Sequence, residues 1–185
     1  MHTTYVYTDG SALNNQRRNS KNTFGGIGAY FGMDDKRNIA EPFFQFPITN
    51  QRTEIKASTR AIQSFMEDKI RRKSEEKEKL IIYTDSQYLI GIMTKWIHKW
   101  KLNYWKTVTG KDVLNKDLIY ELDHLVTLYK DWVEIEFKFV KAHRERKNME
   151  KHKGTDEYKK WWGNLQADIL AKIGSDIAKK SMQGK

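Results

Sequence analysis

Four carboxylates in this chain of 185 residues could bind divalent metal ions together: Asp9, Glu54, Asp85 and Asp168. Carboxylates held within about 4 Å repel one another by roughly 4 kcal/mol at an effective dielectric constant near 20, so a cluster of them implies protonation or bound cations. Oxygen ligands alone favour Mg²⁺ or Mn²⁺ over zinc. The residue types therefore indicate a metal-dependent chemistry.

Each of these carboxylates also has an ordinary interpretation. Asp9 in Thr-Asp-Gly-Ser and Asp85 in Thr-Asp-Ser-Gln resemble turn or capping residues. Glu54 could serve as a first-turn partner of a helix dipole, and Asp168 could lie on a solvated helix face. Their placement favours a shared site, because the carboxyl ends of neighbouring parallel strands meet at one rim of an α/β sheet, where sites usually form.

Hydrophobic patterns predict the elements that would position these side chains. Runs rich in β-forming residues predict three early strands. Apolar residues three and four apart predict an amphipathic helix over 53–73. Asp85 or Ser86 would cap another helix. The strands are expected at 5–8, 24–31, 43–46, 80–83 and 133–140, a further helix over 118–129, and a last helix on an apolar stripe of Leu165, Ile169, Leu170, Ile173 and Ile177. This order is typical of an α/β domain with a mixed sheet. We expect the tail beyond Ile173 to be a frayed helix end.

Composition narrows the class of protein further. Hydrophobic residues make up 38% of the chain, no apolar run approaches the length of a membrane span, and the length suits a single domain over 1–185. The N-terminus lacks the features of a secretory signal, so we expect an intracellular protein. With no cysteine, any metal must bind oxygen or imidazole, and the net charge of +10 favours a polyanionic partner.

Residues 95–106 form a segment rich in both cations and aromatic rings. It contains four Lys, three Trp and one Tyr but no acidic residue. Such a mixture suits a surface that packs against sugars and neutralises phosphates. The alternative is a helical hairpin whose Trp residues pack on one another, and both interpretations can hold together.

Four motifs in chain order resemble those of ribonuclease H: Tyr7–Ser11, Thr49–Glu54, Thr84–Tyr88 and Asn164–Asp168. The resemblance covers most of the chain, and segment 95–106 is similar to the basic handle of the bacterial and eukaryotic type-one enzymes. It implies the ribonuclease H-like fold, a five-stranded mixed sheet flanked by helices. It also implies an endonuclease that cuts the RNA strand of an RNA–DNA hybrid.

The same resemblance implies a catalytic set. Asp9, Glu54, Asp85 and Asp168 would bind two Mg²⁺ ions, for which Mn²⁺ could substitute, and Asp9 would bridge both. One ion would align and activate a water for in-line attack while the other stabilises the departing 3′ oxygen, leaving 5′-phosphate and 3′-hydroxyl ends. His143 takes the place of a mobile family His that assists proton transfer or product release.

Nucleic-acid contacts also follow from the resemblance. Asn50, Gln51 and Gln87 match residues that touch the minor groove and RNA 2′-hydroxyls. Thr49 and Asn115 match two members of a pocket for a DNA phosphate. The full set of expected contacts is Gly10, Ser11, Asn14, Thr49, Asn50, Gln51, Arg52, Gln87, Trp96, Lys99, Trp100, Lys101, Trp105, Lys106, Asn115 and Asn164.

The chain departs from the family pattern in two places. Pro47 stands where an Arg of the phosphate pocket is usual, so the pocket needs another cation. Residues 144–163 form an insertion with seven Lys or Arg against four Asp or Glu, ending in Trp161 and Trp162. A solvated helix extension is one interpretation of the insertion, and a second element that contacts the hybrid is the other.

Three rival functions share parts of this pattern. One is the ribonuclease H domain of a reverse transcriptase. The start methionine four residues before the first strand and a tail without linker character disfavour this function. Another is a non-catalytic hybrid-binding module, which the intact acidic positions disfavour. A third is an integrase or junction resolvase of the same fold, which the handle and the Asn-Gln pair disfavour. We expect a monomer that needs neither a membrane nor a small-molecule cofactor.

Overall fold

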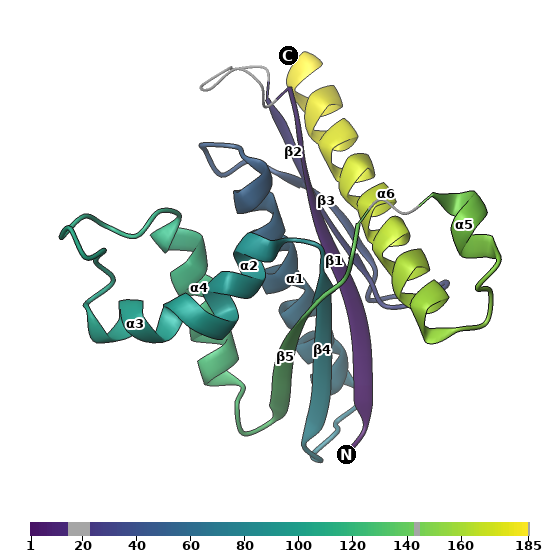
Figure 1. Ribbon diagram of the computed structural model, residues 1–185, viewed down its shortest axis with the longest axis horizontal. Helices are drawn as coiled ribbons and strands as arrows, with labels where there is room; N and C mark the ends of the chain where they lie inside the picture. The colour runs from purple at the N-terminus through teal and green to yellow at the C-terminus, as the bar shows by residue number, and fades with distance from the viewer. Residues whose placement is uncertain (15–22, 143–144, 185) are drawn as a thin grey trace.

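The computed structural model describes residues 1–14, 23–142 and 145–184, which form one five-stranded sheet with helices on both faces (Figure 1). The strand order is β3-β2-β1-β4-β5, with antiparallel pairing of β1, β2 and β3 and parallel pairing of β1, β4 and β5. The elements are β1 (Thr3–Leu13), β2 (Phe24–Tyr30), β3 (Ile39–Phe43), α1 (Asn50–Arg71), β4 (Glu78–Thr84), α2 (Gln87–Gly91), the π-helical η1 (Ile92–Trp96), α3 (Ile97–Leu102), α4 (Lys116–Leu128), β5 (Val133–Phe139), α5 (Arg146–Glu150) and α6 (Asp156–Gln183). The predicted mixed α/β sheet is confirmed.

Side chains that alternate along β1 separate the molecule into two layers. Thr8 lies with its Oγ1 3.3 Å from Oγ of Ser58 on α1, whereas Ser11 lies with its Oγ 3.2 Å from Oγ of Ser175 on α6. The main core fills the α1 side, where Phe65 is fully buried together with residues of α4. Because both layers pack on β1, this strand is held on each side.

Helix starts follow the capping residues that the sequence offers. Thr49 caps α1, since its side chain accepts a hydrogen bond from the backbone N–H of Arg52 at 3.2 Å. Ser86 caps α2 by accepting from the N–H of Leu89, also at 3.2 Å, so Ser86 rather than Asp85 takes that role. Asp85 is therefore left for other contacts.

The third strand lies earlier than the aromatic pattern predicts. β3 ends at Phe43, and the predicted strand residues Phe44 and Phe46 are 55% and 67% exposed. β3 is an edge strand, and it contains Pro42, a residue that only an edge strand or a bulge accommodates. The prediction of a strand over 43–46 is therefore correct only at Phe43, because the strand begins at Ile39 and ends at Phe43.

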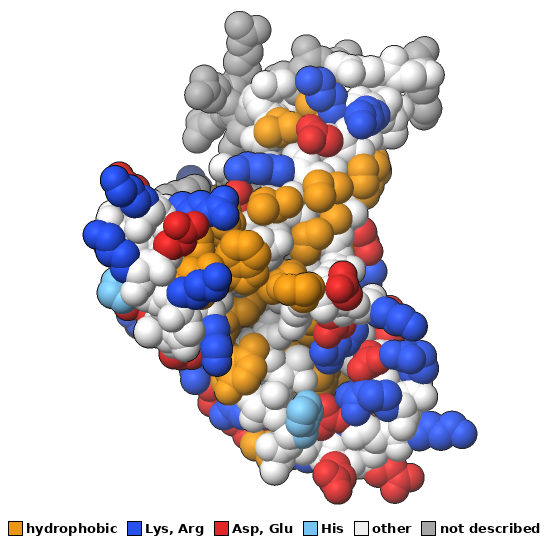
Figure 2. Space-filling view, turned by 90° about the vertical axis from the view of Figure 1, so that its right-hand side faces the viewer, with side chains coloured by type: hydrophobic (Ala, Val, Ile, Leu, Met, Phe, Trp, Pro, Cys, Tyr) orange, Lys and Arg blue, Asp and Glu red, His pale blue; other side chains and the backbone are white. Residues whose placement is uncertain are grey.

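Helix α6 packs on the sheet through its small residues, not through the predicted apolar stripe. Ala167, Ala171 and Ala178 are buried, whereas Ile169, Ile173 and Ile177 are 42–44% exposed. Figure 2 shows the hydrophobic side chains that face solvent in a band on this side of the molecule. A helix approaches a sheet most closely where both surfaces lack bulk, and large apolar side chains then remain outside.

The close approach also explains why the tail is ordered. Gly26 and Gly28 on β2 face α6, and a Cβ built on Gly26 would lie 2.1 Å from the carbonyl oxygen of Ala171. Helix α6 continues to Gln183 with Ala178 only 1% exposed, so the expectation of a frayed end beyond Ile173 was wrong. No helix among the described residues is both long and apolar enough to cross a membrane.

This packing predicts effects of very different size for two substitutions. Gly26→Ala should lower the free energy of unfolding by about 3 kcal/mol or more, because the added methyl group meets the α6 backbone. Ile173→Ser should change it by only about 0.5 kcal/mol, as is usual for exposed positions. Urea denaturation of both variants checks this. A larger loss for Ile173→Ser would mean that the exposed stripe is packed in solution.

Candidate active site

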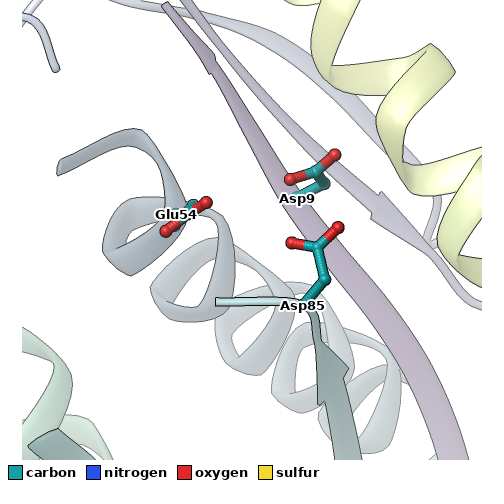
Figure 3. A group of neighbouring side chains, drawn as sticks. All are labelled: Asp9, Glu54 and Asp85. Atoms are coloured by element: carbon teal, nitrogen blue, oxygen red, sulfur yellow. The ribbon is translucent and has the colours of Figure 1, made fainter. Parts of the chain in front are cut away.

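Asp9 and Asp85 are neighbours because β1 and β4 pair in parallel. Thr8 lies opposite Thr84 in the strand register, so the residue that follows each lies at the same rim of the sheet. Helix α1 brings Glu54 to this rim by packing closely on β1: a Cβ built on Gly10 would lie 2.5 Å from the backbone nitrogen of Glu54. Figure 3 shows the three carboxylates, which come from β1, α1 and the end of β4.

The three carboxylates form a compact, partly buried cluster. One carboxylate oxygen from each of Asp9, Glu54 and Asp85 can be chosen so that all lie within 4.8 Å of one another. Burial raises the pKa of Asp9 well above its ordinary value, and the negative charge of Asp85 raises it further, although the Gly10 N–H donates to Oδ1 at 2.8 Å and opposes the rise. A bound cation would offset both the cost of burying these negative charges and the repulsion between them.

Glu54 is perturbed in the same direction. Burial raises its pKa to about 7, against a hydrogen bond with Ser86 that lowers it, and the charge of Asp85 adds to the rise. Because α1 begins at Asn50, its first turn contains no acidic residue. Glu54 therefore does not serve as a first-turn dipole partner, and the interpretation as a site residue is favoured. Its contact with Ser86 is one that sequence reasoning did not predict.

Asp168 lies near the cluster but has a partner of its own. Its charge contributes to the raised pKa of Asp9, yet its Oδ2 lies 2.7 Å from Nζ of Lys172, one turn later on α6. The structure thus brings three of the four predicted carboxylates together and places the fourth beside them. The Lys172 contact was not predicted, although an acid and a base four residues apart on a helix commonly pair.

Asn164 contributes to the cluster from the other side. Its Nδ2 donates to Oδ2 of Asp85 at 3.2 Å, which orients that carboxylate. Its Oδ1 is buried and has no hydrogen-bond partner among the described residues. Buried polar atoms are nearly always paired, so this oxygen is a suitable ligand for a water or an ion. Three carboxylates and a spare amide oxygen fit a Mg²⁺ or Mn²⁺ ion with its waters.

The predicted groove residues are placed around this rim in different ways. Gln51 and Gln87 are exposed beside Glu54 and Asp85. Asn50 accepts a hydrogen bond on Oδ1 from the Ala12 N–H at 3.0 Å, which ties the start of α1 to β1. Ser11 is buried, and its hydroxyl contacts Ser175. Among the other expected contacts, Gly10 lies under α1 and Asn14 follows β1 with a positive φ of 63°.

Arg52 lies where the phosphate pocket was expected to lack a cation. Its Nη1 lies 3.5 Å from Oδ1 of Asn115, and its two terminal nitrogens bond the Asp117 carboxylate at 2.8 and 2.7 Å. Thr49 lies three residues away and caps the same helix. The side chain of Arg52 is only 5% exposed, and its Nε has no partner among the residues described. Thr49, Arg52 and Asn115 thus meet in space.

The Trp residues of the basic handle, defined as residues 95–106, are packed but not all hidden. The rings of Trp96 and Trp100 are 6.0 Å apart, and Trp105 meets Tyr120 edge-on at 5.5 Å. Trp100 and Trp105 rest against the core, whereas Trp96 is 41% exposed. The alternative, in which the Trp rings pack on one another, therefore holds for Trp96 and Trp100 but not for Trp105, and Trp96 keeps an accessible surface.

The handle lysines differ in how far their charges are already balanced. Lys101 pairs with Asp123 at 2.9 Å, and Lys106 pairs with Asp112 at 2.9 Å. Lys99 is exposed, and no carboxylate of the described chain lies within salt-bridge distance of it. His143 lies outside the described residues, so its predicted role remains a prediction.

Comparison with known proteins agrees with this arrangement. The RNase H family model matches residues 1–176. Ribonuclease H1 of Mus musculus is 34% identical over 172 residues, which span 92% of this chain and 49% of that protein. Ribonuclease HI of Haemophilus ducreyi is 34% identical over 139 residues, 75% of this chain and 77% of that protein. The chain thus spans about half the length of its mouse relative.

Solved structures show the same fold at lower identity. LC9-RNase H1, described as a type 1 RNase H with the type 2 active-site motif, superposes with a TM-score of 0.64 at 22% identity, covering 96% of this chain and 74% of that one. The foamy viral protease-reverse transcriptase in complex with an RNA/DNA hybrid gives 0.62 at 19% identity, covering 94% of this chain and 20% of that one. With the family match over nearly all of its length, this chain belongs to the RNase H family.

Proposed function

We propose that this chain is an endonuclease that hydrolyses the RNA strand of RNA–DNA hybrids and leaves 5′-phosphate and 3′-hydroxyl ends. The observation that carries the proposal is the cluster of Asp9, Glu54 and Asp85 in a member of the RNase H family. Relatives named ribonuclease H over most of this chain support the reaction.

The cluster would hold two divalent ions, with Mg²⁺ as the natural choice and Mn²⁺ as a substitute. Asp9, Glu54 and Asp85 supply oxygen ligands, and Asp168 would complete the set by exchanging Lys172 for an ion. Bound ions of this kind supply an activated water and stabilise the departing oxygen. Asp9 is the best candidate for the shared ligand because it is the most buried of the three.

Other side chains prepare the cluster for this task. Asn164 fixes the orientation of Asp85, and Ser86 bonds Glu54 while capping α2. Lys172 balances the charge of Asp168 when no ion is bound. These contacts hold three like charges together in the metal-free protein, so little rearrangement is needed when ions bind. His143 would assist proton transfer, as the resemblance implies.

The surroundings of the cluster suit a duplex. Gln51 and Gln87 are exposed and lie close in sequence to Glu54 and Asp85, where minor-groove edges and 2′-hydroxyls would lie. On the handle, Trp96 and Lys99 have the exposure needed for contact with sugar and phosphate. Tyr104, which the sequence interpretation passed over, is 86% exposed and offers a further aromatic surface.

We propose that Arg52 supplies the cation of the DNA-phosphate pocket in place of the usual Arg at position 47. Thr49 and Asn115 flank it, as the resemblance requires. Asp117 neutralises part of its charge, but this carboxylate is 59% exposed and can turn toward solvent. A phosphate oxygen could then take the place of one carboxylate oxygen on the guanidinium.

A cleavage assay with three substrates tests the function. Labelled RNA–DNA hybrid, duplex DNA and a four-way DNA junction are each incubated with the protein and Mg²⁺. We expect cutting of the hybrid alone, with 5′-phosphate ends on the RNA fragments, and none when EDTA is present. Cutting of the junction in preference to the hybrid would instead support a resolvase.

Hybrid binding by the Arg52→Met variant tests the pocket. The substitution keeps the side-chain volume and removes the charge, so we expect a loss of about tenfold in affinity for the hybrid. Arg71→Met is the matched control, because it removes an exposed arginine charge at the far end of the same helix. Equal affinity of the Arg52→Met variant and the parent would exclude Arg52 from the pocket.

A further inference from the structure

The insertion folds as a small basic lobe beside the cluster. We call its described part, residues 145–163, the basic arm; it contains α5, a turn and the first two turns of α6. Arg146 pairs with Glu150, and Lys160 pairs with Asp156. The arm has four other lysines, all exposed, and no carboxylate among the described residues lies within salt-bridge distance of them: Lys147, Lys151, Lys153 and Lys159.

These lysines project from a packed support, not from a free loop. Met149 in the middle of α5 is 2% exposed, and Trp161 on α6 is 6% exposed. Lys147 and Lys151 are each two positions from Met149, and residues two apart on a helix diverge by about 200°. Since Met149 points inward, both lysines point outward. Figure 2 shows Lys and Arg side chains gathered on this side of the molecule.

Helix α6 connects the basic arm directly to the cluster. Asn164, the residue after the arm, bonds Asp85 at 3.2 Å. Lys159 lies five residues earlier, about 7.5 Å along the helix axis, which is the axial spacing of about two phosphates on one strand. The handle helix α3 lies on the opposite side of the sheet from α5 (Figure 1). The cluster is therefore flanked by cations on both sides.

We propose that the basic arm binds backbone phosphates of the duplex on the side of the cluster away from the handle. This inference rests on the proposed function, because it places a second phosphate-binding surface beside the cutting site. Lys147, Lys151 and Lys159 carry the interaction, since no described carboxylate pairs with them and the residues that support them, Met149 and Trp161, are buried. The pairing of α5 with α6 keeps them in place without the cost of ordering a loop.

The salt dependence of hybrid binding tests the proposal. The arm variant is Lys147→Gln, Lys151→Gln and Lys159→Gln, made in an Asp9→Asn background so that hybrid stays intact in Mg²⁺. The control variant, Lys36→Gln, Lys77→Gln and Lys130→Gln, removes three exposed lysines at the other end of the sheet. Each phosphate contact contributes about 0.9 to the slope of log affinity against log salt concentration. We expect the arm variant to lower the slope by about 2 and the control to leave it unchanged.

A substrate with a fixed cutting site then locates the contact. A duplex with a short block of ribonucleotides in one DNA strand is shortened on one side of the block or the other. Cleavage at low substrate concentration is compared between the parent and a protein that carries the three arm substitutions but retains Asp9. The arm substitutions should reduce cleavage about tenfold when duplex is present on both sides of the block. They should have no effect on the shortened duplex that lacks the side bound by the arm.

The outcomes separate this inference from the function on which it rests. If the parent fails to cut the hybrid, the proposed function is wrong. If the parent cuts but the arm and control variants have equal slopes, the arm does not bind phosphates. A variant with Arg at the three arm positions should keep the parent's slope, and a lowered slope there would show that packing, not charge, caused the change.

Discussion

Replacing Asp9 with Asn is expected to abolish hybrid cleavage while the protein still binds the hybrid. Asp9 is the most buried of the three clustered carboxylates, and an amide is a poor ligand for Mg²⁺. Loss of about 4 kcal/mol of transition-state stabilisation corresponds to roughly a thousandfold fall in rate. Single-turnover cleavage in Mg²⁺ measures this fall. Asp176→Asn, an exposed position on α6, is the matched control and should cut like the parent.

The same substitution should stabilise the metal-free protein. Three carboxylates with oxygens within 4.8 Å repel one another, and removing one charge relieves part of that repulsion. We expect the free energy of unfolding in EDTA to rise by about 1 to 2 kcal/mol. Added Mg²⁺ should raise the Tm of the parent but not that of the variant, because only an ion that binds the folded state stabilises it. Residual cutting above one per cent of the parent rate would contradict the role given to Asp9.

The second large effect concerns stability at the opposite end of the sheet. Glu78, the first residue of β4, is 2% exposed and accepts from Ser74 Oγ at 2.7 Å and from Lys69 Nζ at 3.2 Å. Lys69 is 1% exposed and donates further to the backbone oxygens of Ser74 and Glu76 at 2.9 and 2.5 Å. Arg72 lies 3.2 Å from both carboxylate oxygens. This network ties the end of α1 to the start of β4.

The pKa of Glu78 shows how strongly this network favours the carboxylate. Burial alone would raise the pKa, but the hydrogen bonds from Ser74, Arg72 and Lys69 outweigh burial and lower it to about 2 from the ordinary 4.5. A group whose pKa is depressed in the folded state stabilises the protein above its unfolded pKa. That contribution is lost as the pH falls from about 4.5 through about 2.

Glu78→Gln should therefore lower the free energy of unfolding by about 3 kcal/mol at pH 7, since one pKa unit corresponds to about 1.4 kcal/mol. The variant also leaves Lys69 buried beside a neutral amide, a change that is usually strongly destabilising. Urea denaturation across a pH series measures the effect. The difference between parent and variant should shrink below pH 4.5 and vanish near pH 2. The exposed Glu75→Gln is the control, and a difference that persists unchanged at pH 2 would contradict this account.

The catalytic candidates could be found in the sequence because each lies within a short motif. The sequence pattern placed Asp9 and Asp85 directly after strands and Glu54 near a helix start, so their convergence could be predicted, although β1 continues past Asp9 to Leu13. The pairing of Asp168 with Lys172 and the contact of Asn164 with Asp85 could not, because both depend on the rotation of α6 about its axis. Arg52 replaces the missing pocket cation only through the packing of α1 against α4.

Helix α6 shows why periodicity alone is ambiguous. The isoleucines 169, 173 and 177 form the most hydrophobic face of the helix, and burial of that face is what hydrophobicity favours. The glycines of β2 favour burial of the alanine face instead, because Ala171 can approach them more closely than any isoleucine could. Which face of a helix is buried depends on the shape of its partner, and that shape comes from a distant part of the chain.

The sequence by itself determined the order of elements, the mixed sheet and the carboxylate motifs, since these depend on local patterns and on residue types. Only the tertiary structure decided the buried face of α6, the partners of Arg52 and Asp168, and the burial of Lys69 and Glu78 within a segment rich in charged residues. The physical reason is that a side chain's burial and pairing depend on residues far from it in sequence. No local pattern contains that information.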